Sequence, residues 1–282
     1  MTLKIFLTGA TGYIGGDILY QLYQSHPDFE YALLIRTEDK AKTVLSNYPK
    51  ARIVIGDTAN SSGHDGAAKA ISKGLVQGHS TSRPGFWLHT DIWEVDDKVL
   101  NDLDGIDELV NLPAAAFHRN VDKIALDTGI NHDDAVKTAI IAPPTIYGQG
   151  RGPASNRGRQ VYELASFILK EQYCLRIGKV LSRWNNVHVP DLSMVFELLM
   201  STAVGQEAFK QGLIKGGPPE LCHLSIDEAV NSSAGFEAGS WGMNSRGVAA
   251  RTKKVLGWKP QERSLYDELP DIVQSEASRM DL

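Results

Sequence analysis

The stretch Thr8-Gly9-Ala10-Thr11-Gly12-Tyr13-Ile14-Gly15 decides the fold of this chain. It follows an apolar run at residues 3–7 and opens an amphipathic stretch at residues 13–23, a pattern that predicts a strand, a tight turn and a helix. In such a unit the first glycine permits the turn, the second lets the backbone approach a pyrophosphate, and the third lets helix and strand pack closely. The helix N-terminus adds free N–H groups and a partial positive charge. The sequence therefore predicts a dinucleotide-binding turn, against the simpler alternative of a turn that binds nothing. The turn residues that we expect at the cofactor are Thr8, Gly9, Thr11, Gly12, Tyr13, Ile14 and Gly15.

The composition fits a soluble, enzyme-like protein. The chain has 282 residues, 42% of them hydrophobic, and a formal net charge of -5, which is enough for one large domain or two interleaved ones. The acidic balance argues against a nucleic-acid partner, because no basic excess is available to neutralise phosphates. The 2 cysteines imply no disulfide framework, and we see neither a signal peptide nor an apolar run of membrane-spanning length. We expect a cytoplasmic protein with a small-molecule substrate and without a membrane partner.

Strand and helix patterns alternate after the first unit. We expect strands at residues 31–35, 51–55, 85–90 and 136–142, and helices at residues 38–46, 64–77 and 114–127. This alternation predicts an α/β fold with a doubly wound parallel (Rossmann) sheet over residues 1–150. Residues 151–282 show helical spacing at residues 159–170, 192–204, 245–256 and 264–279, with Ser245 as a candidate N-cap. We expect them to form a smaller, mostly helical substrate domain that interleaves with the first.

The connection after the third strand is too short for a doubly wound sheet. Only residues 58–63 separate Asp57 from the helix expected at residue 64, whereas a parallel crossover takes a dozen or more residues. We therefore expect a strand to be missing beside the first one, at the edge of the cofactor crevice. Similar shortness follows Thr90 and Gly205. Either the protein is truncated at these points or residues have been left out of the sequence, and we favour the second explanation.

Three further segments join the glycine turn in a recognisable order. Pro144-Thr145-Ile146-Tyr147-Gly148 is similar to a P-x-x-[VI]-Y-G motif, residues 186–192 (NVHVPDL) to V-H-V-x-D-L, and residues 256–260 (LGWKP) to L-G-W-x-P. On these motifs the chain resembles an extended short-chain dehydrogenase/reductase of the NAD-dependent epimerase/dehydratase-like superfamily. The resemblance implies a Rossmann cofactor domain and a C-terminal substrate domain. It also places Pro144, Thr145 and Ile146 at the nicotinamide, and Tyr147 at the substrate.

The residue after the second strand distinguishes the two nicotinamide dinucleotides. An acidic residue there binds the ribose 2′-hydroxyl of NAD, whereas a basic one accommodates the 2′-phosphate of NADP. Arg36 occupies this place, with Lys40 one helical turn further on. This predicts NADP(H) in preference to NAD(H), and the alternative is an arginine that ends a strand in solvent. The family resemblance adds Asp57 and Ala59 around the adenine.

The family's catalytic Tyr-x-x-x-Lys motif is absent, because none of the 9 tyrosines is followed by a lysine four residues later. In its place stand residues 117–123 (FHRNVDK). The resemblance gives Lys123 the role of the family lysine, which holds the nicotinamide ribose, and puts Arg119 at the tyrosine position. Arginine cannot give up a proton, but as a fixed cation it can stabilise an oxyanion. His118 is a candidate acid or base, and Thr90 matches the family's Ser or Thr. The alternative for His118 and Arg119 is a polar helix face near solvent.

The substrate side is less well defined. The family carries a basic residue before V-H-V that meets a diphosphate, and Arg183 lies about one residue away from that place. Trp184 either contacts the substrate or packs in the domain interface. Arg151, Arg157 and Arg159 form a solvated loop or receive a carboxylate or phosphate. No cluster of side chains has metal-ligand spacing.

Three functions are compatible with these observations. The first is an NADP(H)-dependent oxidoreductase that reduces a carbonyl or related group of a small metabolite. The second is an NADP(H)-binding redox sensor without turnover, which the absent tyrosine favours. The third is an isomerase or lyase similar to nucleotide-sugar epimerases and dehydratases. A homodimer through the helix at residues 114–127 is an open question.

Overall fold

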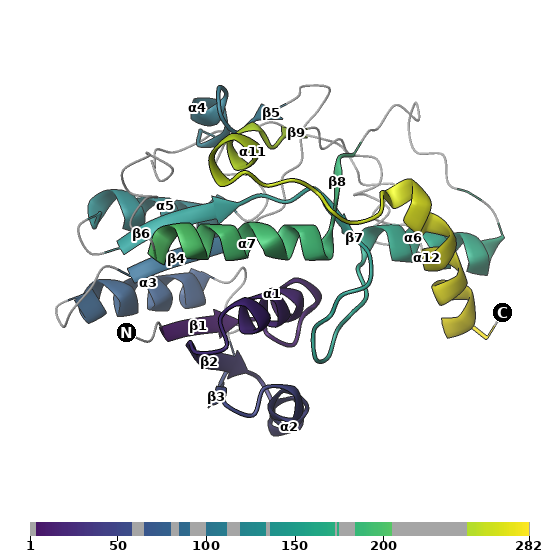
Figure 1. The fold of residues 1–282 in the computed structure, drawn as a ribbon, viewed down its shortest axis with the longest axis horizontal. Helices are drawn as coiled ribbons and strands as arrows, with labels where there is room; N and C mark the ends of the chain where they lie inside the picture. The colour runs from purple at the N-terminus through teal and green to yellow at the C-terminus, as the bar shows by residue number, and fades with distance from the viewer. Residues whose placement is uncertain are drawn as a thin grey trace.

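A computed structural model of the chain shows an α/β protein (Figure 1). The structure describes residues 4–57, 65–79, 85–90, 100–111, 119–133, 136–172, 174, 184–204 and 247–281. Among the residues predicted for the site, Ala59, His118 and Arg183 lie outside this part of the chain. No helix in the described part has the length and apolar character that crossing a membrane requires.

The first sheet has three parallel strands in the order β1-β2-β3. The strands are β1 (Lys4–Thr8), β2 (Glu30–Ile35) and β3 (Arg52–Ile55), and the helices between them are α1 (Tyr13–Ser25) and α2 (Glu38–Asn47). Leu33 and Ile35 of β2 are fully buried together with Leu19 of α1 and Val44 of α2, so apolar residues at strand and helix spacing form one core. Because the strands are parallel, the turn after β1 lies at the same sheet edge as the residues that follow β2 and β3.

A second parallel sheet contains two strands from the middle of the chain. These are β4 (Gly85–Thr90) and β6 (Val136–Ile141), and α3 (Asp65–His79) and α5 (Arg119–Asn131) accompany them. Thr90, the last residue of β4, pairs with Ile141, the last residue of β6. Helices α3 and α5 pack against each other and against this sheet.

The two sheets are not joined by hydrogen bonds. Among the described strands, β1 pairs only with β2, and β4 pairs only with β6. A strand of a parallel sheet is ordinarily buried on both faces, yet Phe6 in the centre of β1 is 53% exposed. This division agrees with the prediction that a strand is missing beside the first one. In the described part of the chain, no strand joins the N-terminal and middle parts of the Rossmann sheet.

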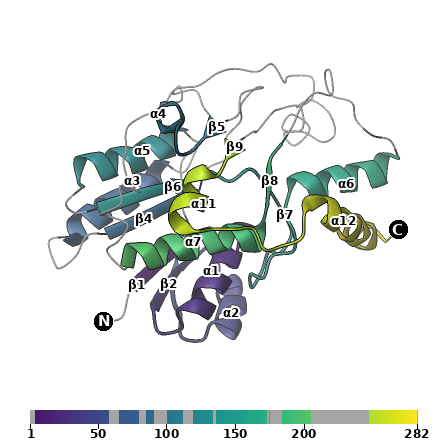
Figure 2. The same cartoon turned by 45° about the horizontal axis from the view of Figure 1, so that its top comes forward.

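The later part of the chain adds short strands and helices around these sheets (Figure 2). β7 (Thr145–Tyr147) pairs with β8 (Asn186–His188), and β5 (Leu100–Asn101) pairs with β9 (Gly247–Val248). The remaining helices are α4 (Ile106–Leu109), α6 (Gln160–Glu171), α7 (Val189–Val204), α11 (Ala250–Leu256) and α12 (Leu265–Arg279). α12 packs against α6, and α7 packs against α1.

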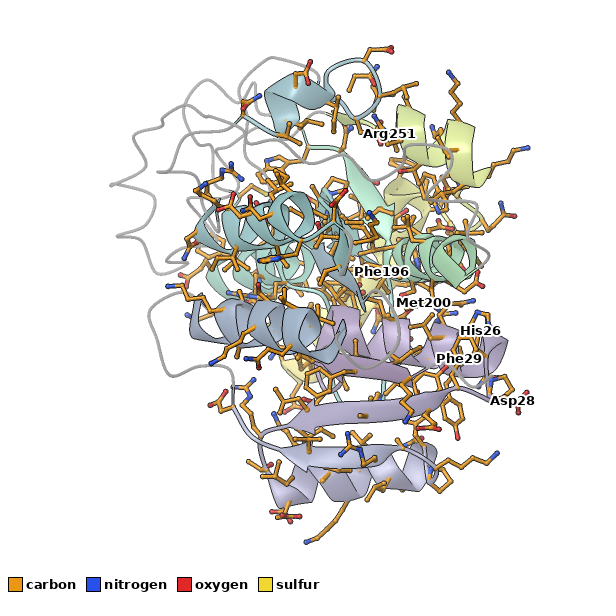
Figure 3. The ribbon with its side chains drawn as sticks, turned by 90° about the vertical axis from the view of Figure 1, so that its left-hand side faces the viewer. His26, Asp28, Phe29, Phe196, Met200 and Arg251 are labelled. Carbon is orange, nitrogen blue, oxygen red and sulfur yellow. The ribbon has the colours of Figure 1, made fainter. Side chains whose placement is uncertain are left out.

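The contact between α7 and α1 makes α7 part of the N-terminal core. Phe196 is buried in that core and Met200 packs against it, and Figure 3 shows both close to His26 and Phe29 at the end of α1. The His26 ring stacks on Phe29 at 4.5 Å and approaches Glu197 of α7 at 3.3 Å. An element from beyond residue 151 thereby covers α1, the helix that begins at the glycine turn.

Some predicted boundaries were wrong. The helix expected at residues 245–256 begins at Ala250, with Ala249 at its N-cap, because residues 247–248 form a strand, and Ser245 lies outside the described residues. The helix expected at residues 114–127 continues to Asn131 and is described from Arg119 onward. α7 begins at Val189, inside the V-H-V segment, three residues earlier than expected.

Candidate functional site

The glycine turn has the backbone conformation that its sequence requires. Gly9 has φ of 74°, a left-handed value that side chains disfavour. The Gly12 N–H donates to the Gly9 carbonyl oxygen at 2.8 Å and closes the turn. A methyl group at Gly15 would lie 2.8 Å from the Gly9 carbonyl carbon and closer still to its oxygen. The third glycine therefore lets α1 begin against the end of β1, as the motif predicts.

The N-terminus of α1 fits an anion. Gly12 is its N-cap and cannot offer a side-chain acceptor, and the first turn contains no acidic residue. The first N–H groups of a helix have no acceptor within the helix, and the aligned peptide dipoles place positive charge there. No side chain of the described residues therefore caps this end of α1. A pyrophosphate beyond Gly9 and Gly12 would accept hydrogen bonds from these N–H groups.

Two basic residues lie at the same sheet edge. Arg36 directly follows β2 and Lys40 lies in the first turn of α2, and both are exposed. Thr37 caps α2 by accepting the Lys40 N–H at 3.4 Å. Neither the Arg36 nor the Lys40 side chain forms an ion pair with another described residue. Asp57 follows β3 at this edge and is exposed too, so Arg36, Lys40 and Asp57 share one sheet edge, while Ala59 lies outside the described residues.

The predicted catalytic residues lie on the second sheet and its helix. Thr90 ends β4, and Arg119 is the first described residue of α5 and is 4% exposed. Lys123 lies one turn further along α5, where its side chain is 59% exposed and its ammonium group contacts Asp127 at 3.1 Å. The alternative of a solvent-facing polar surface is therefore wrong for Arg119. The two cations occupy different environments, one inside the protein and one at its surface.

The residues predicted beside the nicotinamide follow β6. Thr145 donates its hydroxyl proton to the Gln160 side chain at 2.7 Å, and its backbone N–H donates to the Asn185 carbonyl at 3.2 Å. Ile146 packs against the N-terminal core, and Pro144 is half-buried. The Thr145 side chain is therefore held toward α6, so this segment is tied to the C-terminal part of the chain.

Tyr147 is engaged within the protein. Its hydroxyl donates to the Arg263 carbonyl at 2.6 Å, and its ring meets that of His188 edge-on at 5.0 Å. Burial raises the pKa of Tyr147 to about 12, with nearby carboxylates adding to the shift, so the phenol stays protonated at neutral pH. The polar end of this predicted substrate residue is thus already occupied. Tyr147 has the environment of a packing residue.

The four family motifs contact one another. The Tyr13 hydroxyl of the glycine turn donates to the Gly148 carbonyl at 2.6 Å. Trp258 of LGWKP donates its indole N–H to the Asp191 carbonyl at 3.0 Å, and the Asp191 carboxylate accepts the Gln261 N–H at 2.7 Å. With the contact between Tyr147 and His188, these bonds link all four segments. The motifs therefore mark one packing framework between the cofactor turn and the C-terminal part of the chain.

The substrate-side predictions have mixed outcomes. Trp184 is half-buried, and its indole N–H is buried without an acceptor among the described residues. Arg151 and Arg157 bond to buried carboxylates, those of Asp17 and Glu276. These two arginines are therefore not part of a freely solvated loop, and their charges are already matched. No local pattern predicts these two pairs, because the partners lie 134 and 119 residues away.

A polar cavity of about 160 Å³ lies between the loop after β7, α6 and α12. Asn156, Tyr162 and Glu268 are among its lining residues, together with Arg157 from the predicted substrate side, and none of the residues predicted at the cofactor lines it. Burial raises the pKa of Tyr162 to about 12. Among the described residues, no group of histidine, cysteine and acidic side chains is placed to hold a metal ion.

The parallel strands, the glycine turn and the uncapped helix define an NAD(P)-binding Rossmann protein. The chain is 32% identical over 351 positions to the oxidase ucsJ of an Acremonium species, covering 100% of both chains. It is 24% identical to the uncharacterized protein YLL056C of Saccharomyces cerevisiae, over 95% of this chain and 98% of that one. The chain belongs to the extended short-chain dehydrogenase/reductase family, the NAD-dependent epimerase/dehydratase-like proteins. A comparison with family models found no match.

Solved structures with this fold cover nearly the whole chain. UDP-glucuronic acid 4-epimerase from Bacillus cereus, in complex with UDP-glucuronic acid and NAD, superposes with a TM-score of 0.61 at 13% identity, over 98% of this chain and 100% of that one. PbgP3 protein from Burkholderia pseudomallei gives a TM-score of 0.62 at 13% identity, over 100% of this chain and 98% of that one. Since the alignment with the oxidase extends over 351 positions and this chain has 282 residues, gaps fall opposite residues of that relative. Such gaps agree with the short connections and the divided sheet.

Proposed function

We propose that the protein is an NADP(H)-dependent oxidoreductase that reduces a carbonyl or related group of a small metabolite. The observation that carries the proposal is the N-terminus of α1 beyond the glycine turn, where Gly12 offers no side-chain cap, with Arg36 and Lys40 at the same sheet edge and in no ion pair with another described residue. A relative named as an oxidase supports redox chemistry. We keep residues 1–150 as the cofactor domain and residues 151–282 as the substrate region within this proposal.

The chain offers groups for each end of the cofactor. The turn residues 8–15 would hold the pyrophosphate, Arg36 and Lys40 the 2′-phosphate, and Asp57 the adenosine side. When bound, NADPH supplies the hydride that a carbonyl carbon accepts. Lys123 would hold the nicotinamide ribose after leaving Asp127. An exposed ion pair of this kind is worth about 0–1 kcal/mol, so a ribose can compete for the lysine.

The substrate oxygen would meet Thr90 and Arg119. A buried guanidinium keeps its charge and stabilises negative charge that develops on a carbonyl oxygen, and the low local dielectric strengthens this effect. Since arginine cannot donate its proton, the proton that completes the alcohol would come from water, from His118 or from the substrate itself. Trp184 would offer its buried indole N–H to a substrate acceptor.

Calorimetric titration with NADPH, NADP⁺, NADH and NAD⁺ tests the cofactor assignment. We expect the tightest binding for NADP(H), and we expect Arg36→Glu to weaken NADPH binding by about tenfold or more, since hydrogen bonds to charged groups contribute about 1.5–3 kcal/mol. Arg52→Glu is the matched control, because Arg52 is an exposed arginine at the start of β3, away from the carboxyl edge. Equal affinity of wild type and Arg36→Glu for NADPH would remove Arg36 from the site. Absence of binding to all four dinucleotides would overturn the proposal.

A second candidate function is an NADP(H) sensor without turnover. The absent Tyr-x-x-x-Lys motif and the surface ion pair of Lys123 with Asp127 favour it. The discriminating measurement is whether oxidation of NADPH depends on an added metabolite, screened over aldehydes, ketones and nucleotide sugars. In the enzyme, Arg119→Met abolishes turnover in protein that still binds NADPH, whereas Lys123→Ala weakens NADPH binding under either function. Unchanged turnover in Arg119→Met would exclude the oxyanion role.

A further inference from the structure

The loop between β7 and α6, residues 148–159, lies along the first turns of α1 (Figure 1). The Tyr13 hydroxyl bonds to its first residue, Gly148. A methyl group on Gly152 would lie 2.7 Å from the α-carbon of Gly16 in α1, so the two backbones touch and leave no room for a side chain. The 148–159 loop therefore supports α1 directly behind the phosphate-binding turn.

A buried carboxylate fastens this loop to α1. Asp17 is 0% exposed and accepts the backbone N–H of Arg151 at 2.7 Å and its Nε–H at 3.1 Å, both through Oδ2. Its Oδ1 accepts from Nη2 of Arg151 at 2.5 Å and from the Ser193 hydroxyl of α7 at 2.7 Å. Four hydrogen bonds use the whole accepting capacity of a carboxylate. Asp17 thus joins α1, the 148–159 loop and α7 at one point.

The guanidinium of Arg151 has further contacts on α1. Its carbon lies 4.7 Å from the centre of the Tyr20 ring, and Nη1 donates to the Gln21 side chain at 3.3 Å. Tyr20 and Gln21 follow Asp17 by about one turn of α1. Arg151 therefore holds two successive turns of the helix whose first turn forms the predicted anion site.

The charge of Asp17 gives this contact a functional consequence. Asp17 lies four residues after Tyr13, about 6 Å along the helix axis from the end that would face the pyrophosphate. A bare carboxylate there would repel the phosphates and weaken the positive end of the helix dipole. Arg151 matches that charge inside the protein, where charges are screened least.

We propose that Arg151 is a positioning residue of the dinucleotide site, which acts through Asp17 to fix α1 and to neutralise the carboxylate behind the phosphate-binding turn. This inference rests on the proposed binding of NADP(H). It predicts that loss of Arg151 weakens contacts to the pyrophosphate and spares those to the 2′-phosphate, because Arg36 and Lys40 lie on other elements.

The test compares two ligands on the full-length protein. NADPH contains the pyrophosphate, whereas adenosine 2′-monophosphate carries only the 2′-phosphate, and its weaker binding is measurable by ligand-observed NMR. The variants are Arg151→Met, Arg151→Lys and the double variant Asp17→Asn/Arg151→Met. Arg263→Met is the control, since Arg263 also pairs with carboxylates but on the exposed side of α12. Affinities are taken at a temperature at which circular dichroism shows every variant to be folded.

We expect Arg151→Met to bind NADPH about tenfold more weakly and adenosine 2′-monophosphate within twofold of wild type. Arg151→Lys and the double variant should recover part of the loss, because one keeps the charge and the other removes the bare carboxylate. Unchanged NADPH affinity in Arg151→Met, or equal loss of both ligands, would overturn the inference while leaving the proposed function intact. If Arg151→Met does not fold, Arg151→Lys and Ser193→Ala test the inference instead, by the ratio of their affinities for NADPH and adenosine 2′-monophosphate. Failure of wild type to bind any dinucleotide would overturn the proposed function and this inference with it.

Discussion

A single methyl group at Gly15 should disable the cofactor turn. In Gly15→Ala the new carbon would lie 2.8 Å from the Gly9 carbonyl carbon, whereas carbon atoms in good contact are about 3.5–4.0 Å apart. The start of α1 and the end of β1 must therefore separate by about 0.7–1.2 Å. Overpacking of this size lowers the free energy of unfolding by about 1–3 kcal/mol. The same displacement moves the N–H groups of α1 away from the pyrophosphate.

We expect Gly15→Ala to bind NADPH at least tenfold more weakly than wild type, the loss of about one charge-assisted hydrogen bond. Calorimetric titration gives the affinity, and urea unfolding of the free protein gives the stability. Gly74→Ala is the matched control, because Gly74 is exposed within α3 and a methyl group there meets nothing within 4 Å. Alanine should raise the free energy of unfolding at that position by about 0.5–1 kcal/mol and leave binding unchanged.

The reasoning fails if Gly15→Ala keeps wild-type affinity for NADPH and wild-type stability. That result would mean that the turn relaxes without loss of its N–H geometry, or that NADPH binds elsewhere. If Gly15→Ala loses stability but keeps NADPH affinity, the overpacking at Gly15 is confirmed and the displacement of the N–H groups from the pyrophosphate is refuted.

Three other perturbations test the packing of the chain. Arg157→Met should lower the free energy of unfolding by about 2 kcal/mol in urea titration. Glu276 is 0% exposed and would lose its bidentate partner, although Arg279 still bonds to it. An unchanged urea midpoint would refute the pairing of Arg157 with Glu276. Burial raises the pKa values of Tyr147 and Tyr162 to about 12. Their contribution to stability is therefore complete below pH 10 and is lost as the pH rises toward 12. A melting temperature that stays constant between pH 10 and pH 12 would contradict the burial of these two phenols. Phe6→Lys should reduce light scattering at high protein concentration and keep the melting temperature within a few degrees of wild type, since Phe6 is half-exposed. Increased light scattering would show that Phe6 is needed inside the fold.

The regular elements were predictable because their patterns are local. β4 has the predicted bounds, 85–90, and α12 begins after Ser264, whose hydroxyl accepts the Asp267 N–H at 3.3 Å as an N-cap. Apolar spacing and capping chemistry occur within a few residues of each other, so a single sequence contains them in full. The shortness of the connection after Asp57 was likewise a local feature, and it led to the expectation that a strand is missing beside the first one.

The remaining structure depends on partners that are distant in sequence. β5 and β9 have two residues each and pair across a separation of about 150 positions, so neither has a pattern of its own. The bonds of Asp17 to Arg151 and of Arg157 to Glu276 were not predictable either. A charged residue in a helix or loop is ordinarily solvent-exposed, so its type alone does not indicate a buried partner. The sequence therefore indicated where Arg36 lies but could not show that Arg151 bonds to a buried carboxylate of α1.

The contacts among the family motifs change what those motifs say about activity. Tyr13 meets Gly148, Tyr147 meets His188, and Asp191 meets Trp258, so each motif is explained by a packing partner in another motif. This framework keeps the cofactor turn and the C-terminal part of the chain together, and both an enzyme and a redox sensor need that. In the proposed mechanism, turnover depends instead on Thr90, Arg119 and Lys123, which lie outside the four motifs. Metabolite-dependent oxidation of NADPH, and its loss in Arg119→Met, is therefore the observation that separates the two functions, whereas further similarity within the motifs would support both equally.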